Sequence, residues 1–590
     1  MTVYVEKVVK KLFVFQMICL NVFLINAHAD NSDLNVCESF KNNGTYQCSV
    51  FTGDFWSQNS AQIACEEGDV SRGKPGNYEQ FRCDPKPVKG VCFFNKDKND
   101  EYARCGVDDS VLSCWWNGGQ WSSNKELIEN TCFPPAPNDK EIVNVSDSLE
   151  EILEYGEIFG ACDKYFADVD NASRRQMLLC GKWMYFYEHF NFFGAPTQLF
   201  TFMQKVLPNT VGKGWEKMGM FTNPYDEQEL PIGLADAPDF PGSKIPTVNW
   251  TCASCHFGQT PDGRFVVGQS NVNYEYGLQL LSIGLFPQMA AGQVNENEHA
   301  PEAIAAIQPM LDEWNSKPNY WELIKTLLPL LSLPQQTPMD IEQEKAFASW
   351  KAGVQDPVMF PNETNDDVHS PLKILSAYGI PTPAEFADAG HDPMSHVRIG
   401  WAGGMHDLYR FGRTFVALGT DDPQDWGDEK LKPLVEYMYS LKPPKNSESL
   451  SQSLIDQGEV LFKSKECSKC HNGPRYMSLD VFDFDEIGTD EAQKWYFDAE
   501  KDFGEPVPNI YPEEPLILTH SIKAPRLSGL WTQDKFLHNG SVDSLEDLFC
   551  IDHQRPTIME EPYSDRGHMF TCDNLTRDEK LALIEFLKSI

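Results

Sequence analysis

The composition describes a large, strongly acidic globular protein. The chain has 590 residues, of which 41% are apolar and 12% aromatic, and this is enough to bury several hydrophobic cores. Its 87 Asp and Glu residues outnumber its 49 Lys and Arg residues, so the formal net charge is -38. A surface of this sign repels the phosphates of nucleic acids, and we therefore expect no nucleic-acid partner.

The first 29 residues predict a secretory signal peptide. Three lysines within residues 7–11 precede an apolar run at residues 12–25, and Ala27-His28-Ala29 supplies the small residues of a processing site. The apolar run is short for a membrane span, although an N-terminal anchor is the alternative interpretation. We expect a mature chain without a membrane span, located in the periplasm, secreted or held at the cell surface.

Residues 30–135 carry the cysteine pattern of a small module held together by disulfides. Cysteines of exported proteins pair, and small exported domains rely on disulfides where the hydrophobic core is too small to suffice. The eight cysteines of this module are Cys37, Cys48, Cys65, Cys83, Cys92, Cys105, Cys114 and Cys132. Their even number is typical of complete pairing, but it does not define the connectivity.

Two smaller groups of cysteines follow along the chain. Cys162 and Cys180 flank a helical stretch, and Cys550 and Cys572 bracket a segment near the C-terminus. Each group is even, so we expect a disulfide within each of them.

The last four cysteines belong to two copies of one motif, Cys252-Ala-Ser-Cys255-His256 and Cys467-Ser-Lys-Cys470-His471. This CxxCH pattern is the attachment signature of c-type haem. Two thiols one helical turn apart can reach the two vinyl groups of one porphyrin, and the imidazole that follows then faces the iron. A redox dithiol or half of a zinc site is the alternative for a single copy. Two copies in an exported chain favour two covalently attached haem c groups.

The segments that flank the motifs predict helices. Before the second motif, a short helix places Gly458 where another helix can cross, and a C-terminal helix is expected at residues 575–590. The apolar stripe of that last helix is predicted to consist of Leu581, Leu583, Ile584 and Leu587.

This arrangement of crossing helices around a CxxCH motif resembles a cytochrome c fold. A similar closing helix at residues 434–441 is followed by a Pro- and Lys-containing linker at residues 442–449. The predicted fold is therefore mainly α, with cytochrome c-like haem domains at residues 136–445 and 446–590 behind the N-terminal disulfide-rich module.

Two stretches after the second motif carry a narrower resemblance. Lys523-Ala-Pro525-Arg-Leu527 and Phe536-Leu-His538-Asn-Gly540 resemble the signature of the bacterial dihaem cytochrome c peroxidase superfamily. Within that superfamily the chain is most similar to the rubber-oxygenase-like branch, because of its long region before the first motif and its Gly567-His568-Met sequence. The resemblance covers roughly residues 150–590.

The resemblance implies an exported oxidoreductase that activates O2 or H2O2 at the first haem and passes electrons through the second. An electron-transfer cytochrome without a substrate site of its own is the alternative. The implied partners are a small redox protein or an organic or polymeric substrate. A calcium ion between the haem domains is also implied.

The resemblance further implies a set of iron ligands. His256 and His471 are the proximal ligands, and His568 is the preferred sixth ligand of the second haem, with His553 as the alternative. The next histidine after His256 is His299. This departs from dihaem peroxidases, which carry a distal histidine soon after the first motif, and it implies a first iron whose distal position is open.

Candidates for electron conduction and for acid–base chemistry complete the predicted site. Trp250 and Trp401 are candidate conductors between the haems, with an ordinary core role as the alternative for each. Catalytic roles are predicted for Trp401, His406 and Arg413. His406 and Arg413 belong to a cluster with His391 and His396, which is a local concentration of imidazoles in the chain. The alternative is that these side chains bind haem propionates or form surface hydrogen bonds.

Overall fold

The computed structural model describes two compact units, Met1–Glu141 and Ile142–Ile590. In the first unit it describes six strands between residues 35 and 122. In the second it describes residues 142–189, 194–240, 243–292, 295–317, 339–356, 369–392, 399–404, 407–419, 426–495 and 520–590. The predicted signal peptide lies outside these residues.

The six strands of the first unit form one antiparallel sheet with the order β3-β1-β2-β5-β4-β6. In the backbone register of this sheet, Cys48 lies opposite Cys105. The cysteine side chains of the predicted module lie outside the described residues, so their pairing stays a prediction. The strands are β1 (Asn35–Phe40), β2 (Tyr46–Phe51), β3 (Asn77–Glu79), β4 (Gly90–Phe94), β5 (Tyr102–Gly106) and β6 (Gln120–Ser122).

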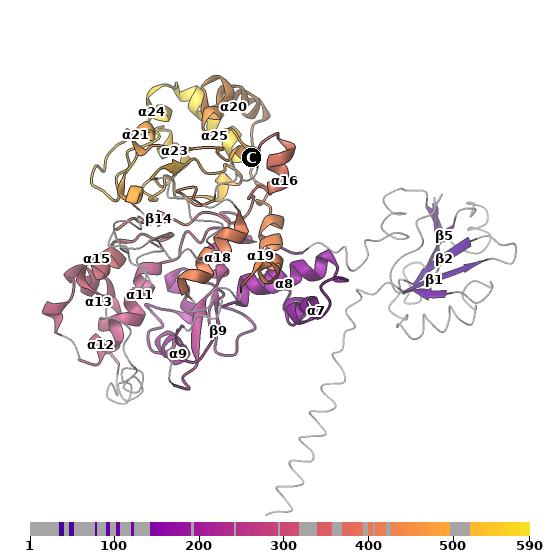
Figure 1. The fold of residues 1–590 in the computed structure, drawn as a ribbon, viewed down its shortest axis with the longest axis horizontal. Helices are drawn as coiled ribbons and strands as arrows, with labels where there is room; N and C mark the ends of the chain where they lie inside the picture. The colour runs from indigo at the N-terminus through magenta and orange to yellow at the C-terminus, as the bar shows by residue number, and fades with distance from the viewer. Residues whose placement is uncertain are drawn as a thin grey trace, which may run out of the picture. The chain divides into compact units, whose positions relative to one another are not determined.

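Helices are the predominant regular secondary structure of the second unit, with only small sheets between them, in agreement with the predicted mainly α class (Figure 1). Its helices up to residue 445 are α5 (Leu149–Leu153), α6 (Tyr155–Ile158), α7 (Ala161–Ala167), α8 (Arg174–Tyr187), α9 (Thr197–Val206), α10 (Cys252–His256), α11 (Tyr276–Gly284), α12 (Phe286–Ala290), α13 (Pro301–Asn315), α15 (Ile341–Ser349), α16 (Pro383–Asp388), α18 (Leu408–Gly419) and α19 (Asp428–Ser440). The later helices are α20 (Gln452–Ser464), α21 (Phe484–Ile487), α23 (Leu545–Leu548), α24 (Phe570–Asp573) and α25 (Arg577–Ser589).

Small antiparallel sheets join these helices. Their strands are β7 (Val145–Ser146), β8 (Ala195–Pro196), β9 (Leu234–Ala237), β10 (Thr247–Trp250), β11 (Phe257–Gln259), β12 (Phe265–Val267), β13 (Val354–Gln355), β14 (Leu372–Lys373), β15 (Val481–Phe482) and β16 (Ile522–Lys523). In the described part of the chain, no helix is both long and apolar enough for a membrane crossing. The division of this unit at residue 445 stays a prediction.

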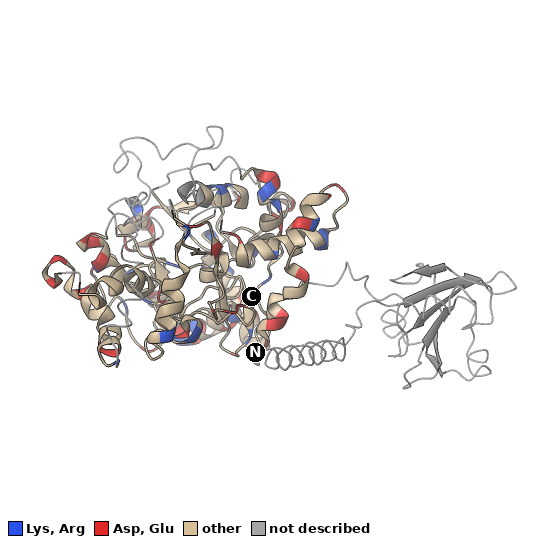
Figure 2. Cartoon of the chain, turned by 90° about the horizontal axis from the view of Figure 1, so that it is seen from below, with Lys and Arg blue, Asp and Glu red and all other residues tan. Residues whose placement is uncertain are grey.

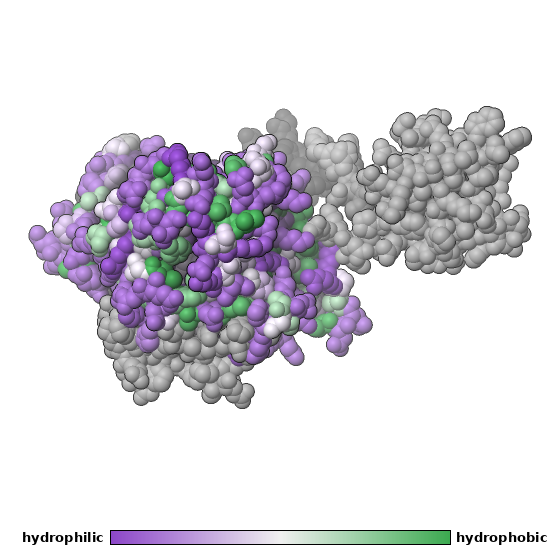
Figure 3. Space-filling view, turned by 90° about the horizontal axis from the view of Figure 1, so that it is seen from above, coloured by the Kyte–Doolittle hydropathy of each residue, from purple (hydrophilic) through white to green (hydrophobic). Residues whose placement is uncertain are grey.

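Acidic residues occur on many helices and loops of the second unit, with Lys and Arg between them (Figure 2). On the face drawn in Figure 3, hydrophilic residues cover most of the described surface, and apolar residues lie in small patches between them. The acidic residues are therefore spread along the described part of this unit and are not confined to one segment.

Helices α8 and α19 cross at a glycine in the first part of this unit. A capping box begins α8, since Ser173 accepts from the backbone of Gln176 and the Gln176 side chain accepts from the backbone of Ser173. A Cβ added to Gly181 would lie 2.0 Å from the carbonyl oxygen of Pro433 in α19. The missing side chain thus permits the close approach of the two helices.

Helices α20 and α25 make the corresponding crossing in the second part, as Gly458 predicted. A Cβ on Gly458 would lie 2.1 Å from the carbonyl oxygen of Ala582. Helix α25 begins with a capping box of Thr576 and Glu579 and buries Ala582, Leu583, Ile584, Phe586 and Leu587.

The predicted stripe of α25 was wrong at one position. Leu581 is 40% exposed. A helix turns by about 100° per residue, so a side chain two positions before the buried Leu583 points away from it. The interface instead includes Phe586, which packs on Phe462 of α20 with ring centroids 5.5 Å apart.

Substitution of Gly458 by alanine is expected to lower the free energy of unfolding by about 3 kcal/mol, because the new Cβ must push apart two helix backbones. Gly156→Ala is the matched control, since a Cβ at that position in α6 meets no atom within 4 Å. It should be neutral or stabilising by up to about 1 kcal/mol. Denaturant unfolding followed by circular dichroism measures both. Equal effects of the two substitutions would contradict the crossing.

Candidate haem-binding sites

The first CxxCH motif forms the one-turn helix α10 between strands β10 and β11. Neighbouring polar groups fix this turn. The Tyr185 hydroxyl donates to the carbonyl oxygen of His256 at 2.6 Å, and the Thr251 hydroxyl donates to that of Phe186 at 3.1 Å. Gly233 packs so closely that a Cβ there would lie 2.4 Å from Cα of Ser254. The turn is therefore held rigidly in the surrounding fold.

The thiols of both motifs are free, whereas the other cysteines with described side chains are paired. Disulfides join Cys162 to Cys180 and Cys550 to Cys572, which confirms the prediction for these two groups. The four motif cysteines are free and partly buried. Burial raises the pKa of Cys252 to about 12 and that of Cys255 to about 11. This donor set of paired thiols followed by an imidazole fits covalent attachment of haem.

The imidazole of His256 is surrounded by protein but keeps part of its surface accessible. Burial lowers its pKa to about 4, the backbone of Leu375 opposes this effect, and the positive charge of Arg526 adds to it. The ring is consequently neutral at pH 7, which is the form that binds a metal ion. Its position at the end of α10 fits a proximal iron ligand.

The second motif begins with a 3-10 turn at Cys467–Lys469, and His471 follows it. The Nδ1 atom of His471 lies 3.0 Å from the carbonyl oxygen of Tyr476. A carbonyl at Nδ1 holds that nitrogen as the proton donor and leaves Nε2 for a metal. Burial lowers the pKa of His471 to about 4, against the opposing backbones of Tyr476 and Pro525.

The two candidate sixth ligands of the second haem differ strongly in their surroundings. Burial, followed by the nearby imidazole of His471, lowers the pKa of His568 to about 3. Its Nδ1 atom is buried, and within the described residues it has no hydrogen-bond partner. The side chain of His553 is 51% exposed and lies 3.3 Å from the carboxylate of Asp547. His568 therefore fits the ligand role better, and its ligation stays a prediction.

The segment Lys523–Arg526 interacts with the imidazoles of both motifs, through the Pro525 backbone at His471 and through the charge of Arg526 at His256, and sequence reasoning quoted it without giving its residues a role. The Pro525 backbone faces His471, while the Arg526 guanidinium acts on His256 and donates through Nε to the Tyr378 carbonyl oxygen at 2.8 Å. Burial lowers the pKa of Arg526 to about 10. A partly buried cation whose charge acts on a CxxCH imidazole fits the carboxylate of a haem propionate.

Trp401 connects strand β14 to the segment Lys523–Arg526. Its indole Nε1 donates to the carbonyl oxygen of Lys373 at 3.0 Å, and its own carbonyl accepts from the backbone of Lys523 at 2.8 Å. The indole also packs edge-on against His538 at 6.3 Å. Trp401 thus bridges the two parts of the unit.

Trp250 is integrated into a hydrophobic core instead. Its Nε1 donates to the Tyr274 hydroxyl at 2.7 Å and to Gln279 Oε1 at 2.9 Å, and its ring packs edge-on against Phe200. These contacts favour the core role that was the alternative for this residue.

The predicted acid–base cluster is incompletely described. His396 and His406 lie outside the described residues. Arg413 in α18 forms an ion pair with Asp428, the first residue of α19, and so links these two helices. Catalytic roles for His406 and Arg413 stay predictions, as does the calcium ion, and the described residues hold no group of three or more His, Cys, Asp and Glu that could bind a metal ion.

His538 makes the stability of the fold dependent on pH. It is 2% exposed, and burial lowers its pKa to about 3. Below the unfolded-state pKa of about 6.5, the unfolded chain binds more protons than the folded chain. The stabilisation from this residue is therefore complete above pH 6.5 and is lost as the pH falls toward 3.

His538→Gln is expected to reduce the loss of stability on acidification, by about 1 kcal/mol per pH unit between pH 6 and 4. Denaturant midpoints across this pH range measure the slope. The exposed His553→Gln is the control and should retain the steeper slope of the unsubstituted protein. Equal slopes for both variants would rule out a buried neutral His538.

Comparisons with known proteins add little to this geometry. No protein-family model and no curated protein matches the chain. Among solved structures, a chain of Kuenenia stuttgartiensis hydrazine synthase is 18% identical, with 42% of this chain and 79% of that chain covered, and its TM-score is 0.22. A likeness at this score defines neither a fold nor a function for the chain.

Proposed function

We propose that this chain is an exported dihaem c-type cytochrome oxidoreductase that activates O2 or H2O2 at the first haem and passes electrons through the second. The observation that carries the proposal is the state of the two CxxCH motifs. Their four thiols are free while four other cysteines form disulfides, and each motif ends in a neutral imidazole surrounded by protein.

The residues at the two sites support different roles for the two haems. His471 and His568 would hold the second iron, with the Tyr476 carbonyl orienting His471. His256 would hold the first, and the charged group acting on it in the described part of the chain is Arg526. When bound, a haem iron with two imidazoles exchanges electrons with little rearrangement, and one with an open position activates O2 or peroxide.

The chain itself would contribute positioning and charge. Arg526 would pair with a propionate near His256, and Trp401 would occupy the region between the two parts of the unit. The close packing of α10 would keep the imidazole of His256 in a fixed orientation. The substrate class, an organic compound, a polymer or a small redox protein, belongs to the same proposal.

The alternative is an electron carrier without a substrate site. EPR and absorption spectra of the resting and reduced full-length protein distinguish the two. A high-spin signal, together with binding of carbon monoxide or peroxide at one haem, is expected for the oxidoreductase. Two fully low-spin haems that bind neither carbon monoxide nor peroxide would contradict the oxidoreductase and favour the electron carrier.

A further inference from the structure

Arg555 is a buried arginine in the loop between helices α23 and α24. It is 5% exposed, and an arginine stays protonated, so its guanidinium needs partners inside the protein. The carboxylates of Asp565 and Asp547 supply nearby negative charge. Four hydrogen bonds of the guanidinium, however, go to backbone carbonyls, and this arrangement serves to position chain segments.

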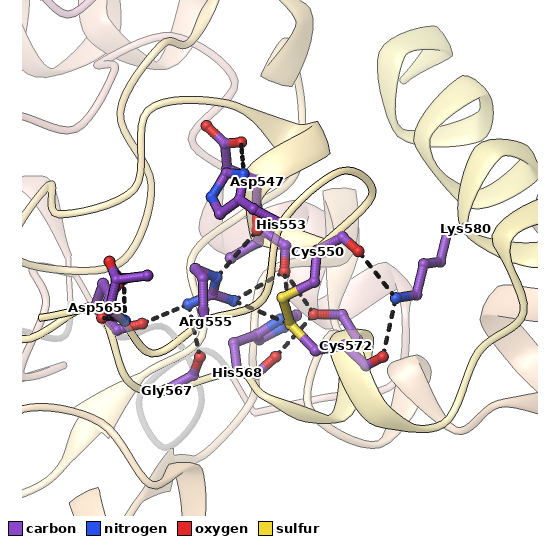
Figure 4. Close-up of a disulfide and its surroundings, with 12 residues drawn as sticks. Asp547, Cys550, His553, Arg555, Asp565, Gly567, His568, Cys572 and Lys580 are labelled. Carbon is purple, nitrogen blue, oxygen red and sulfur yellow. Dashed lines mark hydrogen bonds and ion pairs between the residues drawn. A yellow bond between two sulfur atoms is a disulfide. The ribbon is translucent and has the colours of Figure 1, made fainter.

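The guanidinium joins two segments that are distant in sequence (Figure 4). On one side it binds the end of α23, with Nε donating to the carbonyl oxygen of Asp547 at 3.0 Å and Nη2 to that of Leu548 at 2.9 Å. On the other side Nη1 donates to the carbonyl oxygens of Asp565 at 2.6 Å and Gly567 at 3.3 Å. The second segment ends at Gly567, directly before His568.

The backbone at His568 needs such support. Gly567 has a φ of 113° and His568 has a φ of 53°. Residues other than glycine rarely adopt a positive φ, and they keep this conformation where contacts with the surrounding structure hold it in place. Gly567 also has no room for a side chain, since a Cβ there would lie 2.6 Å from the Thr489 hydroxyl.

The disulfide secures the other end of the same loop. The disulfide joins Cys550, which lies just after α23, to Cys572, which lies in α24. The Nη2 atom of Arg555 is 3.8 Å from the Cys572 sulfur. Lys580 Nζ donates to the carbonyl oxygen of Cys572 at 2.9 Å. Arg555 thus fixes the chain before His568, and the disulfide fixes the chain after it.

We propose that Arg555 is a positioning residue that holds the His568 imidazole against the second haem by binding the Asp547–Leu548 and Asp565–Gly567 carbonyls together. The inference rests on the proposed ligation by His568. A neutral side chain at position 555 would leave buried carbonyls without donors and would release the strained backbone at His568. His568 would then dissociate from the iron more often and compete less well with added ligands.

The test uses the full-length haem-loaded protein and imidazole as the probe. Low-spin EPR signals and absorption spectra of the second haem are recorded during imidazole titration of Arg555→Gln, His568→Ala and Arg577→Gln. Arg577 is the matched control, because it also donates to a backbone carbonyl of this region, that of Ile551 at 2.9 Å, but is 61% exposed. Haem content and thermal unfolding are measured in parallel.

Arg555→Gln is expected to bind imidazole at the second haem about tenfold more tightly than the unsubstituted protein, as loss of buried hydrogen bonds implies. Arg577→Gln should not differ from the unsubstituted protein. An unchanged affinity in Arg555→Gln, with an opened site in His568→Ala, would overturn the role of Arg555 while leaving the ligation intact. An unchanged spectrum in His568→Ala would overturn the ligation itself. If Arg555→Gln fails to retain haem, the same titration is carried out on Arg555→Lys. A higher affinity of this variant for imidazole at the second haem would support the role of Arg555, and an unchanged affinity would refute it.

Discussion

Replacement of His256 by alanine is expected to lower turnover with O2 or H2O2 at least about 100-fold, because the first iron would lose its proximal ligand. The spectrum of the second haem should be retained, since His471 packs on Phe462 of α20 and its partner Tyr476 packs on Phe586 of α25. Steady-state turnover and the two haem spectra of the same preparation measure both effects.

His553→Ala is the control for this substitution. His553 is half exposed, and its side chain is bound by Asp547 rather than surrounded by the core. Its removal should change neither turnover nor spectra. Retained turnover in His256→Ala would contradict a reaction at the first haem. A loss of both haem signals would mean that the two sites are one structural unit.

Removal of the Cys550–Cys572 disulfide is expected to have a large effect on both stability and the second haem. The double substitution to alanine is expected to lower the free energy of unfolding by about 3 kcal/mol, because the bond closes a loop with a sequence separation of 22 residues. The loop contains both Arg555 and His568. The variant should therefore also convert part of the second haem from low spin to high spin, which EPR measures.

The Cys162–Cys180 disulfide supplies the matched control. It closes a loop of similar length, with a separation of 18 residues, and it joins α7 to α8 in the first part of the unit. Its removal should lower stability by a similar amount and leave the spin state of the second haem unchanged. Equal spectral changes in both double variants would show that the effect on the second haem follows from general destabilisation.

Local patterns in the sequence were sufficient to predict several parts of the fold. Gly458, placed one turn before an aromatic residue, predicted a helix crossing because only glycine allows two backbones to approach that closely. The even grouping of cysteines predicted the two described disulfides. The C-terminal helix expected at residues 575–590 is α25 (Arg577–Ser589), while Leu581 shows that an apolar residue alone does not define the buried face.

Contacts between distant segments were not predictable in the same way. Arg555 has no motif around it, and its role depends on carbonyls that a loop brings together from residues 547–548 and 565–567. Arg526 was visible as part of a signature, but its hydrogen bond to the Tyr378 carbonyl and its charge effect on His256 link segments that are far apart in the sequence. The spacing of side chains along one segment does not predict contacts between segments that are distant in the sequence.

The most direct test of the central claim is the haem content of the full-length protein, expressed with its predicted signal peptide. Mass spectrometry of the denatured chain, with pyridine haemochrome spectra for quantity, is expected to give two covalently bound haems per chain. Cys252→Ala/Cys255→Ala and Cys467→Ala/Cys470→Ala should each retain one. A chain that carries no covalent haem, or holds zinc at these cysteines, would contradict the account.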